Sequence, residues 1–423
     1  MKNFILSVCL LFNISLSAQV IDADKVMIIG RNALYYEDYV LAIQYFNQVV
    51  KAKPYLSEPY YYRAVAKFLL EDFKGAEEDC TSCIERNPFI TNAYFVRGDS
   101  RLNLGDYDGA IEDYDKSLTM VPENKPVLTN LSLANIQKKD YTRAEDILNK
   151  LVVQDSSYVQ AYLIRGSMFL EKGDTIQAIN DYNKAIVKDP YLSQSYSRRG
   201  VLYSQLKEYD KALADFDEAI KLEPLFSGNY INRGLVKYYK DDYRGAMADY
   251  DKVVDLEPNN IIGRFNRGLL RAQVGDDNRA ITDFDVVLTF EPSNYIAYFN
   301  RALLKSNTGD YKGAISDFDK VLDEYPDFYQ GFYARSDLKK KIKDTQGADK
   351  DFRYAKAEED RIRKAIFAGK EPAKKEGDKT REKSDNTIDK FNLLMVADKT
   401  EQEKTNTTMQ QGAKCRISRS TST

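Results

Sequence analysis

A period of 34 residues runs through the sequence without a single insertion. Its clearest marker is an alanine that returns ten times in phase, at Ala42, Ala76, Ala110, Ala144, Ala178, Ala212, Ala246, Ala280, Ala314 and Ala348. Ten copies in phase do not arise from composition alone. A period of this size indicates stacked supersecondary units, because no such unit can bury its apolar face alone. The repeat therefore replaces the expectation of two or three globular domains for 423 residues.

Each unit is predicted to consist of two helices joined by a short turn. The first helix carries a small residue at one fixed phase, at Gly30, Ala64, Gly98, Ser132, Gly166, Gly200, Gly234, Gly268, Ala302 and Ser336. Glycine inside a helix costs about 1 kcal/mol relative to alanine, so its return predicts a close approach of another helix. In the second helix an aromatic residue follows the alanine by four positions in eight units, at Phe46, Tyr114, Tyr182, Phe216, Tyr250, Phe284, Phe318 and Phe352. This spacing places the alanine and the aromatic residue on one helix face.

The ends of the second helix are also marked. Four turns read Gly-Asp, which predicts N-caps at Asp106, Asp174, Asp276 and Asp310, while Glu208 replaces the aspartate in one unit. A proline stops the second helix in eight units, because proline cannot continue a helix.

This pattern of small residue, alanine, aromatic residue and proline resembles the tetratricopeptide repeat. The resemblance covers about residues 23–362. It implies an all-α fold, a right-handed superhelical solenoid of ten helix–turn–helix repeats, whose first helices line a concave groove that binds partners, often peptides. The fourth unit departs most, with Leu128, Leu131, Leu148 and Ser156 at places usually held by Tyr, Arg, an aromatic residue and Pro.

Eight units share a pair of opposite charges. Each has an arginine in the first helix and an aspartate sixteen residues later, from Arg63 with Asp79 to Arg335 with Asp351. Units one and four lack both residues, with Leu131 and Ile147 in unit four. This co-occurrence predicts an ion pair between the two helices of one unit. A ladder of ligand-binding arginines is the functional alternative, and shared duplication history would also explain the co-occurrence.

The groove is the predicted binding site. By the resemblance, it is lined by residues of the first helices, which are Tyr61, Phe95, Leu163, Ile231, Leu235, Phe265, Leu269, Phe299, Leu303 and Tyr333. Asn232, Asn266 and Asn300 lie beside them in the sequence. An apolar strip with amides nearby suits an extended peptide. The alternative is that these residues simply pack between neighbouring units.

Composition argues against catalysis. The 423 residues include no histidine, which excludes His-based acid–base catalysis and His metal ligands. The 62 basic and 65 acidic side chains nearly balance, so charge gives no case for a nucleic-acid partner or an anionic membrane. We expect no enzyme activity and no cofactor. Cys80 and Cys83 form a CxxC spacing, but they fall at packing positions and are interpreted as small core residues rather than a redox or metal site.

The two ends differ from the repeats. Residues 1–18 read as a signal peptide, with Lys2 before a short apolar run, and predict an exported protein that is periplasmic or secreted. No other segment is apolar enough to cross a membrane. Residues 363–423 form a charged tail, expected to be mostly disordered, in which Phe391–Val396 is an apolar island.

Together these features predict a non-catalytic scaffold that binds a protein or peptide partner. The alternative is a subunit of a bacterial envelope assembly or secretion complex, with a fixed stoichiometric partner. An enzyme with a catalytic tail is a third hypothesis, which the composition of the tail disfavours. The sequence leaves self-association through the ends of the solenoid open.

Overall fold

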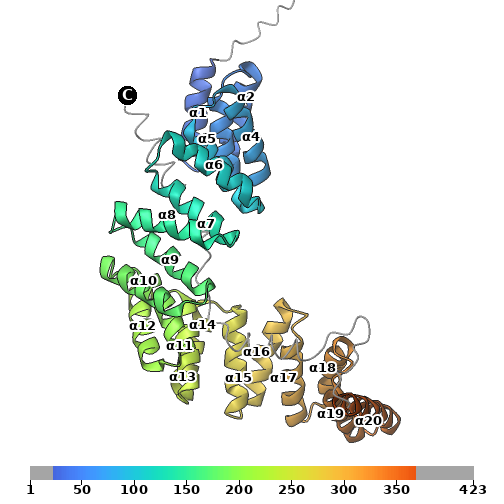
Figure 1. Cartoon of the computed structure of the whole chain (residues 1–423). Helices are drawn as coiled ribbons and strands as arrows, with labels where there is room; N and C mark the ends of the chain where they lie inside the picture. The colour runs from blue at the N-terminus through green and yellow to red at the C-terminus, as the bar shows by residue number, and fades with distance from the viewer. Residues whose placement is uncertain (1–21, 368–423) are drawn as a thin grey trace, which may run out of the picture. The chain divides into compact units, whose positions relative to one another are not determined.

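The computed structural model describes residues 22–367, which form helices and no strands. The helices are α1 (Ala23–Tyr35), α2 (Tyr39–Ala52), α3 (Glu58–Leu69), α4 (Phe73–Arg86), α5 (Thr91–Leu104), α6 (Tyr107–Met120), α7 (Lys125–Gln137), α8 (Tyr141–Gln154), α9 (Val159–Glu171), α10 (Thr175–Lys188), α11 (Ser193–Gln205), α12 (Tyr209–Leu222), α13 (Ser227–Tyr239), α14 (Tyr243–Leu256), α15 (Ile261–Gln273), α16 (Asp277–Phe290), α17 (Tyr295–Asn307), α18 (Tyr311–Glu324), α19 (Tyr329–Lys341) and α20 (Thr345–Phe367). Consecutive helices pack in pairs, as the repeat predicts (Figure 1).

The chain divides into two compact units between Lys172 and Gly173. The first unit contains α1 to α9, and the second contains α10 to α20. In both units the odd-numbered helices are the first helices of repeats and the even-numbered helices are the second. The last helix runs on to Phe367. The predicted signal peptide and the apolar island lie outside the described residues.

Each repeat closes around the contact between the small residue and the aromatic residue. A Cβ atom built on Gly98 would lie 2.7 Å from Cε1 of Tyr114, which is too close for any real contact. Gly234 and Tyr250 repeat this arrangement at 2.8 Å. The predicted close approach of the two helices is therefore confirmed. The aromatic rings are fully buried here, and burying such a side chain contributes roughly 1.5–3 kcal/mol.

Aspartate caps most of the second helices. Asp106, Asp174 and Asp310 each accept a hydrogen bond from the backbone N–H three residues later, as predicted. Asp276 occupies the N-cap position of α16 but makes no such bond, so that prediction is wrong in its detail. The carboxylate of Asp276 instead pairs with Nε of Arg279 at 2.6 Å. A charged partner three residues away thus replaces the capping hydrogen bond.

None of the helices in residues 22–367 combines the length and apolar character that a membrane span requires.

Candidate functional site

A ladder of ion pairs holds the repeats together. In seven of the predicted pairs, the arginine and the aspartate belong to the same compact unit, and all seven ion pairs form. These are Arg63–Asp79, Arg97–Asp113, Arg199–Asp215, Arg233–Asp249, Arg267–Asp283, Arg301–Asp317 and Arg335–Asp351. In the Arg199 pair, Nε lies 2.9 Å from Oδ2 of Asp215 and Nη2 lies 2.6 Å from Oδ1. Two parallel bonds of this kind fix the relative position of the two helices.

The same arginines also reach the preceding repeat, which the sequence reasoning missed. Nη1 of Arg199 donates to Oδ1 of Asn183 at 2.6 Å, sixteen residues earlier. All eight ladder arginines make this bond, to Asn47, Thr81, Asn149, Asn183, Asp217, Asp251, Asp285 and Asp319. An acceptor side chain at each of these places was the available sequence signal. Each of the seven paired arginines therefore joins its own first helix to the second helices of two consecutive repeats, and we call this three-helix unit a rung.

Burial and cations compete at the rung aspartates. Burial raises the pKa of Asp215 above its usual value, against the hydrogen bonds from Arg199. Burial acts in the same direction at Asp351, but Arg335 and Lys339 together hold the pKa of that carboxyl below its usual value. Lys339 lies 2.9 Å from the Asp351 carboxylate, whereas Tyr203 occupies the corresponding place near Asp215. The rungs are thus built with different numbers of cations.

The ten predicted groove residues do not form one accessible strip. Four of them are buried, namely Leu163, Ile231, Leu235 and Phe265. Five are partly buried, namely Tyr61, Phe95, Leu269, Phe299 and Tyr333. Leu303 is 41% exposed. Phe265 is only 1% exposed and its ring packs edge-on against Phe284, with centroids 5.6 Å apart. A partner can therefore contact only part of the predicted surface in this conformation.

The three asparagines beside this surface are occupied or buried. The Asn300 amide donates to the Ile296 carbonyl of its own helix at 2.9 Å. Asn232 and Asn266 are 2% and 6% exposed. Their side chains are therefore not presented to a peptide backbone in the way the sequence suggested.

The CxxC residues belong to the core, as interpreted from the sequence. Cys80 and Cys83 are both fully buried and free. Burial raises the pKa of the Cys83 thiol to about 12 and that of Cys80 well above its usual value. Thiolates are the reactive form of cysteine, so these two side chains behave as small apolar residues.

One buried carboxyl was not anticipated. Asp99 in α5 is fully buried, and its Oδ1 accepts hydrogen bonds from Tyr114 Oη at 2.6 Å and from Asn130 Nδ2 at 2.7 Å. Its Oδ2 is buried without a partner. Burial raises the pKa of Asp99 to about 7, more than the two hydrogen bonds lower it. The two hydrogen bonds of Asp99 thus link α5 to α6 and α7.

Comparison with known proteins agrees with the repeat pattern. Family models described as tetratricopeptide repeat match residues 63–125 and 95–159, 159–186 and 228–260, 193–225, and 296–327, which together make slightly more than half of the chain. No curated protein is similar enough to match.

Solved structures of repeat proteins are also similar to the chain. A tetratricopeptide repeat protein from Parabacteroides merdae is 19% identical, covers 63% of this chain and 98% of its own, and has a TM-score of 0.43. MamA is 29% identical, with 40% and 92% covered and a TM-score of 0.35. YrrB, described as a TPR protein with an unusual peptide-binding site, is 20% identical, with 44% and 97% covered and a TM-score of 0.40. Because these TM-scores are below 0.5, the family assignment rests on the family models and the repeat itself.

Proposed function

Because the chain is a tetratricopeptide-repeat protein, and proteins of this family are generally protein–protein interaction scaffolds, we propose that it is a non-catalytic scaffold that binds a peptide segment of a partner along its first helices. The observation that supports the proposal most is the exposure of Leu303. An apolar side chain that stays 41% exposed on a first helix is available for burial by another molecule.

The proposed binding surface lies in the second compact unit. Leu303 is on α17, and Leu269 holds the equivalent place on α15, one repeat earlier. Phe299 lies one turn before Leu303, and Tyr333 follows on α19. Phe299 and Tyr333 keep part of their rings accessible while they pack against Phe318 and Phe352. Rings anchored in this way present apolar area with little loss of side-chain entropy on binding.

Crosslinked affinity purification tests this surface with a charged substitution. In Leu303→Glu the partner should be lost, because a carboxylate would have to be buried in an apolar contact. Phe290→Glu is the matched control, since Phe290 is 50% exposed but ends the second helix α16. Both variants should keep wild-type helicity. Recovery of the same partner by Leu303→Glu would move the binding site away from the first helices.

The same purification separates the two functional hypotheses. A partner bound transiently through a short segment supports the scaffold. A membrane complex recovered at fixed stoichiometry would instead support a subunit of an envelope assembly.

We also propose that the protein is exported. The proposal rests on residues 1–18 of the sequence, which have the composition of a signal peptide. Mass determination of the N-terminal peptide from the native source tests it. Cleavage after Ala18 is expected, and a full-length protein retained in the cytoplasm would contradict export.

A further inference from the structure

The first and fourth repeats lack the rung, and in the fourth repeat the omission leaves a pocket. In the fourth repeat Leu131 stands at the arginine position and Ile147 at the aspartate position. In six other repeats a tyrosine three residues before the arginine lies beneath the guanidinium, 5.4–5.9 Å from its carbon, and Leu128 replaces this tyrosine. An arginine and a tyrosine are thus replaced by the smaller Leu131 and Leu128, and the aspartate is replaced by the apolar Ile147.

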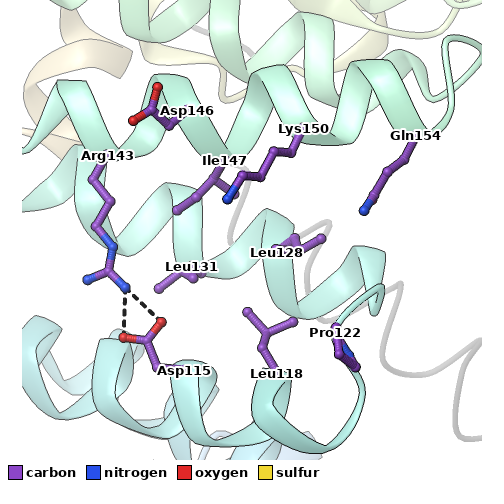
Figure 2. A pocket seen from close by; sticks show the side chains of 10 residues that line it. All are labelled: Asp115, Leu118, Pro122, Leu128, Leu131, Arg143, Asp146, Ile147, Lys150 and Gln154. Carbon is purple, nitrogen blue, oxygen red and sulfur yellow. Dashed lines mark hydrogen bonds and ion pairs between the residues drawn. The ribbon is translucent and has the colours of Figure 1, made fainter.

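The space that these groups would occupy is a pocket of about 360 Å³ within the first compact unit (Figure 2). It opens between α6 and α8, the second helices of two consecutive repeats, and α7 forms its floor. Leu118, Leu128, Leu131 and Ile147 supply apolar surface. A volume of this size lies at the lower end of the range for ligand pockets in proteins.

Asp115 is the residue that would accept a hydrogen bond from the missing arginine, and it already pairs with Arg143 at the edge of the pocket. Asp115 lies sixteen residues before Leu131, where the other repeats place the acceptor of the arginine. Both carboxylate oxygens of Asp115 accept from Nη2 of Arg143 at 2.7 Å. Arg143 comes from α8, so it closes one end of the pocket without filling its floor (Figure 2). Because the buried aspartate is also replaced, no charge remains on the floor to attract a cation.

The other end of the pocket carries two hydrogen-bond donors, the Lys150 ammonium and the Gln154 amide. Lys150 and Gln154 extend from α8 over the pocket, and the exposed Asp146 also lines it, one turn before Lys150 (Figure 2). Among the described residues, neither Lys150 nor Gln154 has a hydrogen-bond or ion-pair partner, and both are exposed. An ammonium and an amide beside an apolar floor complement an acidic group next to an apolar one.

We propose that this pocket is a second binding site, which takes a large apolar side chain of a protein partner, Leu or Phe, with an adjacent acidic residue reaching Lys150. The apolar side chain lies on Leu128, Leu131 and Ile147, in the volume that Tyr and Arg fill in other repeats. The carboxylate of the neighbouring residue lies near the Lys150 ammonium and the Gln154 amide. This site opens between the second helices α6 and α8 of the first compact unit, and Leu303 lies in the second unit, so the site does not depend on the surface around Leu303.

Methyl NMR of the full chain tests the site with defined peptides. The probes are capped pentapeptides of sequence Gly-Ser-Xaa-Glu-Ser, in which Xaa is Phe, Leu or Ala. The Phe and Leu peptides should shift the methyl signals of Leu128, Leu131 and Ile147, and should bind about tenfold more tightly than the Ala peptide, because they bury several more carbon atoms. A synthetic peptide of residues 386–398, which contains the apolar island, is an additional probe.

Two variants decide whether the pocket itself binds. The triple variant Leu128→Tyr, Leu131→Arg, Ile147→Asp restores the rung of the other repeats and should abolish the shifts by filling the pocket. Lys150→Glu leaves the core untouched and should weaken the Phe peptide about tenfold. Lys116→Glu is the matched control, since Lys116 holds the same position one repeat earlier, where the Arg97–Asp113 pair is intact.

Several results would overturn the proposal. These are the absence of methyl shifts with every peptide at millimolar concentration, equal binding of the Ala peptide, and unchanged binding in both Lys150→Glu and a folded triple variant. Binding of the 386–398 peptide alone would assign the pocket to the protein's own tail instead of a partner. Leu303→Glu should leave all of these shifts unchanged, so failure here and failure of the first-helix surface are distinguishable.

Discussion

The rung at Arg199 allows the ladder to be tested by a double substitution. We expect Arg199→Leu to destabilise the protein more than the double variant Arg199→Leu, Asp215→Ile. The double variant installs the residue pair that the fourth repeat carries naturally, Leu131 and Ile147. Removing more of the wild-type contacts should therefore restore stability, which is the signature of a buried ion pair.

The expected magnitude follows from the surroundings of Asp215. This residue is 4% exposed, and Arg199 is its only paired cation among the described residues. Leaving a buried carboxylate without its partner costs about 3–5 kcal/mol. In the double variant the charge is gone, and the main loss is the hydrogen bond to Asn183 together with some packing, about 1–2 kcal/mol. The two variants should thus differ by about 2–3 kcal/mol.

The defect of the single variant should also depend on pH. Burial already raises the pKa of Asp215 in the wild type, and loss of Arg199 removes what opposes that shift. A carboxyl whose folded-state pKa lies above its unfolded value contributes stability at low pH, and this contribution is lost as pH rises through the folded-state pKa. Arg199→Leu should therefore be less destabilised at about pH 5 than at about pH 8.

Local stability is the appropriate readout, because repeat arrays open in parts. Hydrogen exchange of peptides from α11 and α12 should report the loss, together with urea unfolding followed by circular dichroism. Arg335→Leu is the control, since Asp351 keeps Lys339 and should suffer less. Equal losses in the single and double Arg199 variants, at both pH values, would refute the reasoning.

Three further predictions concern the second and third repeats. Burial raises the pKa of Asp99 to about 7, so the contribution of Asp99 to the stability of the wild type is fully present below about pH 4 and falls by up to about 1.4 kcal/mol per pH unit as pH rises to 7. Asp99→Asn should remove this pH dependence, which thermal melts of the wild type and the variant across this range will detect. Gly98→Ala should lower the melting temperature, at a cost of about 1–3 kcal/mol, because its Cβ would lie 2.7 Å from Tyr114. Cys80 should resist iodoacetamide in the native protein and react only after denaturation, as measured by peptide mass spectrometry, because it is fully buried.

The helical repeats were predictable because the sequence repeats them. An in-phase pattern averages over ten copies, so the exceptions of one unit do not obscure it. The ion pairs could be predicted for the same reason. The arginine and the aspartate, such as Arg199 and Asp215, occur together in eight units and are absent together from two. The bond from Arg199 to Asn183 was missed, because the acceptor varies among Asn, Thr and Asp and shows no single residue type.

The accessibility of the first helices could not be predicted in the same way. Phe265 and Leu303 were assigned to one surface, yet their exposed fractions are 1% and 41%. Exposure depends on the side chains that neighbouring helices bring, such as Phe284 against Phe265, and these vary from repeat to repeat. The N-cap at Asp276 failed similarly, because the side chain of Arg279 competes for its carboxylate. Arg143 holds the same place after Asp140, but its side chain pairs with Asp115 and Asp140 keeps its capping bond.

The missing rung connects stability with specificity. Identical repeats present equivalent surfaces, so a partner that recognises one repeat could bind in several registers. A scaffold that positions its partner needs a place where one repeat differs. The rungs are numerous, and each contacts only neighbouring repeats, so the array can lose one without losing its fold. Leu131 and Ile147 therefore make the fourth repeat unlike the others at low structural cost, and the pocket between α6 and α8 is the feature by which a partner can tell one register from the next.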